Sequence, residues 1–383
     1  MPRKTSALAA LFIVLCGAAQ AGDVAISGFL SVGGGYVDDE AHSRNGYTEE
    51  DFTFDQDSLL GLQVSANISD KATVTAQITG RGKDDWQAET SWAYFAYQVT
   101  DNFQWRMGRV RVPFYFYSDF IDVGYAYAWI SPPQELYSLP FDNIEGVDAL
   151  WNTSLGSVDV LVQGYYGATH WVDSFSPDST SRDQLGVVLQ LSSGWFQGRL
   201  AHHQADVNSP NQDITDLSDA VAFAGFSANA DQVKVEDDPF TFDGVAVMMD
   251  SGRFLAGFEQ TILESNDETP IAKEIRSYFM AGVRFGDFLV HVTKSRRRDE
   301  AADLSSGIPA GQANPVFGDT DTLIGILDGL TEDQVSDTDA KTIGLRWDFT
   351  SSAAFKVEYT KQDDNRPSDN NVKLVRFAIQ SVF

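Results

Sequence analysis

The stretch SLLGLQVSANISDKATVTAQITGRG, Ser58–Gly82, alternates apolar and polar residues on both sides of a tight turn at Asp70–Lys71. The apolar positions recur every second residue: Leu60, Leu62, Val64, Ala66 and Ile68 before the turn, and Ala72, Val74, Ala76 and Ile78 after it. In a β-strand, successive side chains point to opposite faces. The stretch therefore predicts an antiparallel hairpin with one face in an apolar medium and the other in water.

Such a hairpin suits a sheet folded onto a protein core as well as a strand pair that faces lipid. Similar alternating segments occur sixteen times along the chain, beginning near Val24, Leu59, Lys71, Thr90, Asn102, Gly146, Ser157, Asp183, Trp195, Phe240, Arg253, Ile275, Asp287, Lys341, Ala354 and Val372. Several of them approach the roughly 9–11 residues that a tilted membrane strand needs, whereas soluble strands usually have about five or six. Their length favours membrane strands.

The connections between these segments fall into two classes. One end has short turns such as Ser69–Asp70 and Gly286–Asp287, and the other has long polar segments at about 115–145, 206–239 and 298–339. This sorting is typical of short periplasmic turns and long extracellular loops, and a sandwich has no reason to show it. We therefore predict an all-β fold, a transmembrane antiparallel β-barrel of sixteen strands, whose closure leaves no unpaired edge in lipid.

The first 21 residues, MPRKTSALAALFIVLCGAAQA, are typical of a secretory signal peptide. A basic start precedes an apolar stretch, and Ala19-Gln20-Ala21 supplies a cleavage site with small residues. We predict that residues 1–21 are removed, which leaves residues 22–383 as the barrel domain. The single cysteine, Cys16, leaves with the peptide, so the mature chain needs no disulfide and has no catalytic thiol.

The charge of the chain limits its partners. The formal net charge of −28 becomes −30 when Arg3 and Lys4 leave with the signal peptide. A chain this acidic repels phosphates, which excludes nucleic acid as a partner. After the signal peptide, no apolar run approaches the roughly 20 residues of a membrane helix, which excludes a helical inner-membrane protein.

The last segment, VKLVRFAIQSVF, Val372–Phe383, contains no turn-forming residue and ends on an aromatic ring. Three apolar residues share one face, which we expect to meet lipid: Val375, Phe377 and Ile379. Arg376 and Gln380 alternate with them and are expected to face the lumen. We predict that this segment is the last strand and closes the barrel by pairing with the first, near Val24–Tyr36.

With sixteen expected strands, a signal peptide and a terminal Phe, the chain resembles Gram-negative outer-membrane porins over essentially its whole mature length. The most specific part is NFQWRMGRVRVPFYFYSDFIDVGYAYAWISPPQELYSLPFDNIEGVDALW, Asn102–Trp151, which resembles the family's fifth strand, inward-folded third loop and sixth strand. Enterobacterial porins carry Pro-Glu-Phe-Gly on that loop, whereas Leu139–Asn143 stands nearby here. Their pore size and ion selectivity are therefore not transferred.

The resemblance implies a water-filled channel in the outer membrane for passive diffusion of small hydrophilic solutes and ions, narrowed by the loop at about 113–145. It also implies a homotrimer that contacts outer-membrane lipid and lipopolysaccharide. Phe383 matches the signal by which the family is recognised by the barrel assembly machinery, whereas Ser381 replaces the aromatic residue often found two positions earlier. The resemblance implies no cofactor.

The charges of the narrowing can be assigned from strand parity. Arg109 and Arg111 share a strand face, and if Val110 and Val112 on the other face meet lipid, both guanidiniums project into the lumen. Arg81 is a further wall candidate. The loop carries five carboxylates: Asp119, Asp122, Glu135, Asp142 and Glu145. A basic wall opposite an acidic loop would create a transverse field that acts on passing solutes. Alternatively, the charges pair and pin the loop to the wall, and both can hold.

The same loop is rich in aromatic residues from Phe114 to Phe141, which could stack on sugars or aromatic solutes or could pack the loop against the wall. In two other long loops, Asp321–Leu330 and Ser218–Ala230 predict short amphipathic helices, the first of them lying on the barrel mouth. Acidic pairs could bind Ca²⁺ or Mg²⁺ that bridges lipopolysaccharide, or could be merely solvated: Asp237–Asp238 and Asp363–Asp364.

Two other classes of outer-membrane protein fit the sequence less well. A barrel enzyme would need an activated nucleophile with a histidine and an orienting acid. None of the five histidines stands in a recognisable catalytic signature: His42, His170, His202, His203 and His291. A siderophore receptor would need an N-terminal plug, and here the first strand begins almost at the cleavage site; a surface adhesin is a further binding-only alternative. We therefore expect a channel, general or selective for sugars or small organic ions, and not an enzyme.

Overall fold

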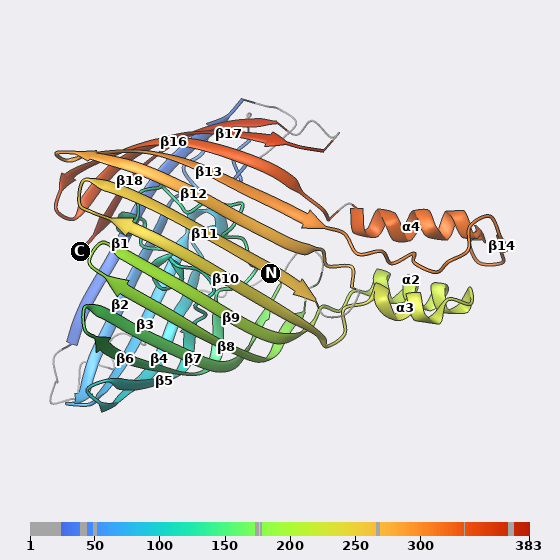
Figure 1. Ribbon diagram of the computed structural model, residues 1–383, viewed down its shortest axis with the longest axis horizontal. Helices are drawn as coiled ribbons and strands as arrows, with labels where there is room; N and C mark the ends of the chain where they lie inside the picture. The colour runs from blue at the N-terminus through green and yellow to red at the C-terminus, as the bar shows by residue number, and fades with distance from the viewer. Residues whose placement is uncertain are drawn as a thin grey trace, which may run out of the picture.

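The computed structural model describes residues 24–38, 44–48, 52–172, 176, 178–265, 269–332, 334–366 and 371–383. The predicted signal peptide, residues 1–21, lies outside them. Sixteen antiparallel strands form one closed barrel (Figure 1). The first eight are β1 (Val24–Val37), β2 (Leu59–Ser69), β3 (Ala72–Arg81), β4 (Ala88–Thr100), β5 (Phe103–Arg111), β6 (Asn143–Leu155), β7 (Val158–Trp171) and β8 (Ser179–Ser193). The others are β9 (Phe196–Asn208), β10 (Asp238–Asp250), β11 (Phe254–Ser265), β12 (Lys273–Phe285), β13 (Phe288–Glu300), β16 (Asp337–Thr350), β17 (Ala353–Asp364) and β18 (Val372–Val382).

Each barrel strand begins within four residues of the position predicted from the sequence, so the predicted fold is confirmed. The barrel closes where β18 pairs with β1, in a register that runs from Phe29 opposite Val382 to Val37 opposite Leu374. The terminal residue takes part in this closure, because Gly28 N donates to Phe383 O at 2.8 Å and Phe383 N donates to Gly28 O at 3.0 Å. The C-terminus is thus joined to the first strand.

The two faces of the barrel wall differ as the alternation predicts. On β18, Val375 is 45% exposed and Ile379 50%, whereas Arg376 and Gln380 are buried inside. The hairpin of β2 and β3 behaves alike: Leu62 and Val74 are exposed on the outer face, whereas Thr75, Gln77 and Thr79 on the other face of β3 are buried. The apolar face is therefore the one that meets lipid.

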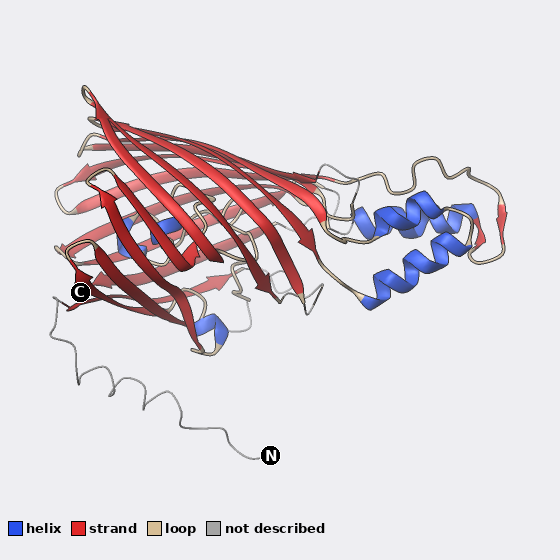
Figure 2. Ribbon diagram, turned by 90° about the horizontal axis from the view of Figure 1, so that it is seen from below, coloured by secondary structure: helices blue, strands red, loops and turns tan. Residues whose placement is uncertain are grey.

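A long segment between β5 and β6, Val112–Asp142, lies inside the barrel and is called the lumenal loop (Figure 2). It contains two short 3₁₀ helices, η2 (Ser118–Phe120) and η3 (Gly124–Ala126); a third, η1 (Gly82–Asp84), follows β3. Aromatic residues of the loop and residues of the wall form one hydrophobic cluster: Phe114, Tyr115, Tyr117, Tyr127, Trp129, Phe242, Tyr278 and Met280 among others. Most of the loop's aromatic rings therefore pack the loop in place.

Three helices lie beyond one end of the barrel (Figures 1 and 2): α2 (Gln212–Phe223), α3 (Ser227–Val233) and α4 (Thr320–Glu332). They come from two long loops and share a hydrophobic cluster that includes Val221, Val233, Leu323 and Leu327. The segment predicted as one helix, 218–230, is divided at Gly225, whose φ of +100° is accessible to glycine. A two-stranded ribbon, β14 (Ala313–Asn314) and β15 (Gly318–Asp319), precedes α4. Within the described ranges, no helix has the length and apolar character needed to cross a membrane.

Candidate functional site

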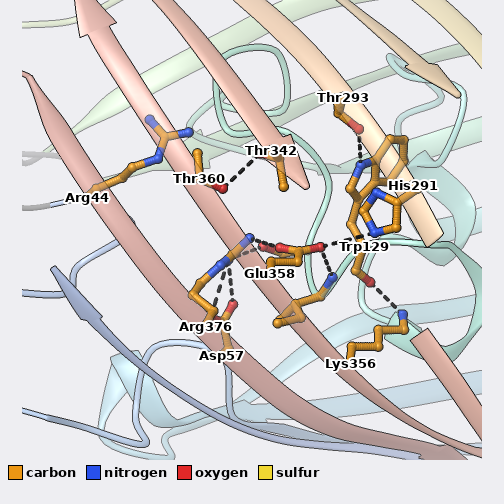
Figure 3. A network of polar contacts seen from close by, with 12 residues as sticks. Arg44, Asp57, Trp129, His291, Thr293, Thr342, Lys356, Glu358, Thr360 and Arg376 are labelled. Atoms are coloured by element: carbon orange, nitrogen blue, oxygen red, sulfur yellow. Dashed lines mark hydrogen bonds and ion pairs between the residues drawn. The ribbon is translucent and has the colours of Figure 1, made fainter. Parts of the chain in front are cut away.

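The lumenal loop is held to the wall by a buried lysine (Figure 3). Lys356, on β17, is 1% exposed. Its ammonium donates to three backbone carbonyls of the loop: Gly124 O at 2.7 Å, Tyr127 O at 2.7 Å and Trp129 O at 2.5 Å. Arg346, on β16, also donates to Tyr127 O, at 2.8 Å. Two cations of the wall thus bind the carbonyl groups of one short stretch of the loop.

A second set of contacts joins the next residues of the loop to β17 and β18 (Figure 3). Glu358 accepts a hydrogen bond from Ile130 N at 2.8 Å and one from Arg376 Nη2 at 2.7 Å. The other guanidinium nitrogen, Arg376 Nη1, donates to Ser131 Oγ at 2.7 Å and to Asp57 Oδ1 at 3.1 Å. Because these charges are buried and paired, the loop backbone is fixed to both strands.

The loop also bonds to strands further along the same part of the wall. Glu259, on β11, accepts hydrogen bonds from Phe116 N at 2.6 Å and from Tyr137 Oη at 2.5 Å. Trp129 Nε1 donates to Thr293 Oγ1, on β13, at 2.8 Å. The lumenal loop is therefore anchored to several strands of the wall from β11 to β18.

Asp122, one of the predicted loop carboxylates, binds two of the predicted wall arginines. Asp122 accepts from Arg81 Nη2 at 2.9 Å and from Arg111 Nη2 at 2.7 Å, and Asp142 lies 3.3 Å from Arg111 Nη2. Burial by itself would raise the pKa of Asp122, but Arg111 and Arg81 outweigh this effect and lower the pKa to about 2. These four residues form the pinning contact that was one of the two predicted alternatives.

Glu135 lies away from the predicted arginines. It accepts from Arg44 Nη2 at 2.6 Å and from Ser295 Oγ at 2.8 Å. Burial would raise the pKa of Glu135, but the Arg44 guanidinium and the Ser295 hydroxyl together lower it below its ordinary value. Glu135 therefore anchors the far part of the loop.

The expectation that Val110 and Val112 meet lipid is wrong. Each is 1% exposed and belongs to the interior cluster around the loop. Met107 is 52% exposed and points outward. Because side chains alternate along a strand, Arg106 and Val110, which lie one and three positions from Met107, point inward. The physical reason is that the wall beneath the loop is apolar, so an apolar residue there faces inward.

Arg109 is next to Val110 on β5, so its side chain starts from the opposite face of the strand and does not lie beneath the loop. It lies beside Glu145, with 2.5 Å between Arg109 Nη1 and Glu145 Oε1, and 3.7 Å from Glu89 Oε1. Arg111 has the same parity, but as the last residue of β5 it turns into the loop and is 3% exposed. The two arginines thus have separate partners.

A charged pair on the inner wall was not predicted from the sequence. Arg106 Nε donates to Asp148 Oδ1 at 2.8 Å, and the two residues are direct partners in the β5–β6 register. The Arg106 guanidinium also lies 5.3 Å from the centre of the Tyr94 ring and 6.0 Å from that of Trp92. Their opposite charges could have been noticed, but their pairing depends on a register set across the whole lumenal loop.

The loop borders three cavities of the lumen. The outer apolar cavity, about 530 Å³, and the outer polar cavity, about 470 Å³, lie on the side of the long loops. The outer polar cavity is lined by Arg81, Glu89 and Arg109 among others. The inner cavity, about 510 Å³, is lined by residues of a short turn, including Trp195, together with Arg346. The lumenal loop therefore lies between spaces at the two ends of the barrel.

The described histidines have separate neighbours. His203 Nδ1 lies 2.7 Å from Tyr165 Oη, and His291 Nε2 lies 3.9 Å from Glu358. The other two lie beside aspartates: His170 beside Asp178 and His202 beside Asp243. His42 lies outside the described residues. In the part of the chain that the structure describes, no group of three or more His, Cys, Asp or Glu side chains could hold a metal ion.

The acidic pairs considered for divalent cations lie at the long-loop end. In the second pair, Asp363 contacts Lys361 Nζ at 2.5 Å and Asp364 contacts Arg366 Nη2 at 3.4 Å. In the first pair, Asp238 Oδ2 accepts from Glu236 N at 3.0 Å. Asp238, Asp363 and Asp364 thus have partners within the protein.

Comparison with known proteins gives one family and one fold. A family model described as Gram-negative porin matches residues 5–380. Similar solved structures include Salmonella typhi OmpF in complex with daunomycin, with a TM-score of 0.59, 10% identity, and coverage of 94% of this chain and 97% of that one. The outer membrane channel DcaP of Acinetobacter baumannii has a TM-score of 0.57, 12% identity, and coverage of 94% and 97%. The anion-selective porin from Comamonas acidovorans has a TM-score of 0.55, 11% identity, and coverage of 94% and 99%. No curated protein sequence shows significant similarity to the chain.

Proposed function

The chain belongs to the family of Gram-negative porins and forms an outer-membrane channel for passive diffusion, and we propose that solutes pass between Asp119 and Arg106. The observation that carries this proposal is the exposed position of Asp119 beside a charged part of the inner wall. Other parts of the lumenal loop are held by hydrogen bonds to β11, β13, β16, β17 and β18, and Asp122 is held by Arg81 and Arg111. Asp119 itself is exposed and is one of the charges that act on Arg106.

The charges along this route favour cations. Four guanidinium groups, those of Arg81, Arg106, Arg109 and Arg111, lie among six carboxylates: Glu89, Asp119, Asp122, Asp142, Glu145 and Asp148. Most of these charges are paired, so the local field comes from the excess carboxylates. We infer a modest preference for cations. The main role of the predicted wall and loop residues is to hold the lumenal loop to the wall through ion pairs.

Reversal potentials in a salt gradient test the proposed route. Asp119→Asn should lower the cation preference, because it removes an exposed charge beside the passage. Glu236→Gln is a matched control, since Glu236 is exposed and pairs with Lys234 in a distant loop. An unchanged reversal potential in Asp119→Asn would contradict the route. Absence of any current from refolded parent protein would contradict the channel itself.

Assembly and export are further parts of the proposal. We infer that residues 1–21 are cleaved as a signal peptide, that Phe383 serves the assembly machinery, and that three barrels associate among lipid and lipopolysaccharide. The support is the family resemblance and, for Phe383, its place at the seam with Gly28. Sedimentation of the detergent-solubilised protein distinguishes one barrel from three, and currents in steps of three would agree with a trimer.

We infer also that the channel has no catalytic activity. Of the described histidines, His203 and His291 are buried against aromatic rings of the lumen, an arrangement suited to packing. A substrate-selective channel is the second candidate, and the outer apolar cavity is the observation that favours it.

A further inference from the structure

The outer apolar cavity differs from what a general diffusion channel needs. It lies between the lumenal loop and the inner wall of β7–β12, and its apolar lining includes Phe114, Phe141, Trp171, Phe240, Phe242 and Leu263. Porin interiors are ordinarily polar, because their solutes are hydrated. The volume, about 530 Å³, is within the range of small-molecule binding sites. The cavity therefore has the size and lining of a ligand site.

Three of the residues that line this cavity each carry a buried polar atom. These atoms are Ser181 Oγ, Gln184 Oε1 and His203 Nε2, and none has a hydrogen-bond partner among the residues that the structure describes. The three residues are 0%, 1% and 2% exposed. Buried polar atoms are nearly always paired in folded proteins. Three unpaired atoms around one apolar cavity point to a bound molecule that supplies their partners.

Neighbouring contacts assign the roles of two of these atoms. Gln184 Nε2 donates to Tyr165 Oη at 3.5 Å, and Tyr165 Oη lies 2.7 Å from His203 Nδ1. If the hydroxyl donates to Nδ1, the neutral ring carries its proton on Nε2. His203 Nε2 is then an unpaired donor, and Gln184 Oε1 is an unpaired acceptor.

A glycine makes this arrangement possible. In the strand register, Gly186 lies between Tyr165 and His203. A Cβ at Gly186 would lie 2.3 Å from a Tyr165 ring carbon and 2.4 Å from His203 Nδ1. The tyrosine and histidine can therefore meet only over a residue without a side chain.

We propose that the outer apolar cavity binds an uncharged aromatic solute that carries both a hydrogen-bond acceptor and a donor, as an aromatic carboxamide does. The ring packs against the phenylalanines, the carbonyl oxygen accepts from His203 Nε2, and the amide N–H donates to Gln184 Oε1. An aromatic carboxylate fits less well, since it brings no donor and meets the acidic side chain of Glu274. The inference deepens the proposed function and rests on it, because the cavity opens toward the outer end of the channel.

Equilibrium binding of benzamide to the refolded mature chain in detergent tests the proposal, with saturation-transfer NMR as the readout. Benzamide should bind more tightly than benzoate and cyclohexanecarboxamide, by roughly threefold or more. Gln184→Leu should weaken benzamide binding by roughly three- to tenfold. Gln77→Leu is the matched control, since Gln77 is a buried lumenal glutamine that bonds to Gln63 outside this cavity.

Three results would overturn the proposal: no benzamide binding by the parent, equal binding by Gln184→Leu, or equal binding of all three probes. If Gln184→Leu does not refold, judged by circular dichroism, Ser181→Ala removes a different polar atom of the cavity and should weaken binding by roughly two- to fivefold. Benzamide binding is measured independently of ion current, so the binding proposal and the proposed channel function can be contradicted independently. A conducting channel that does not bind benzamide contradicts only this inference, and a protein that binds but never conducts contradicts the proposed function.

Discussion

Replacement of Lys356 by methionine should release the lumenal loop while leaving the barrel intact. The loss of the ammonium removes the donor to three carbonyl groups, but Tyr127 O keeps its bond from Arg346. Gly124 O and Trp129 O are then left without that donor, at about 1–3 kcal/mol each. The variant also avoids the cost of burying a charge. We therefore expect the lower end of the summed cost for the two carbonyl groups, about 2 kcal/mol. This free energy would increase the population of molecules with a displaced lumenal loop roughly 30-fold.

Single-channel recordings in planar bilayers measure this displacement. The parent should show steady current levels, whereas Lys356→Met should fluctuate between levels because its loop leaves the anchored position. Lys361→Met is the matched control, since Lys361 lies on the same strand, is exposed and pairs with Asp363. If the current through Lys356→Met is as steady as the currents through the parent and the control, the buried lysine does not hold the loop and the reasoning is refuted.

Other parts of the structure give three further predictions. The pKa of Asp122 is about 2 against an ordinary 3.8, so its arginine pairs stabilise the loop fully above about pH 4 and are lost as the pH falls through about 2; unit conductance should be constant from about pH 4 to 8 and change below about pH 3, and a transition near neutral pH would contradict this. A Cβ at Gly28 would lie 2.9 Å from the backbone oxygen of Gly61 and 2.5 Å from the Phe383 ring, so Gly28→Val should lower the free energy of unfolding from urea titrations by roughly 1–3 kcal/mol, while Gly198→Val, where a Cβ meets open space, should not. Leu323 is fully buried among the helices beyond the barrel, so Leu323→Asp should reduce the helical circular dichroism and leave the unit conductance unchanged; a barrel that fails to refold would show that the helices are needed for it.

The strands could be predicted from the sequence because each meets lipid on one face and the lumen on the other. The clearest case is β18, where Val375 and Ile379 face outward and Arg376 and Gln380 face inward. The same reasoning failed on β5, because Val110 lies beneath an apolar loop and faces inward. Alternation gives the two faces of a strand, but it identifies the inner one only where that face is polar.

The anchoring of the loop was less accessible from the sequence. Lys356 and Glu358 lie two positions apart on β17 and therefore share a face, so an inward lysine could have been found. That its ammonium binds backbone carbonyls of residues more than 200 positions away could not, because such contacts depend on the path of the loop. The Arg106–Asp148 pair likewise depends on the β5–β6 register.

The most direct test of the central claim, that an open passage runs beside Asp119, is modification of a single cysteine during current recording. The chain is produced without residues 1–21, so Cys16 is absent, and carries Asp119→Cys. A bulky cationic thiol reagent should lower the current in discrete steps. Ser157→Cys, at an exposed turn, should react without changing the current. If Asp119→Cys reacts fully and the current stays the same, solutes do not pass beside the lumenal loop at this point.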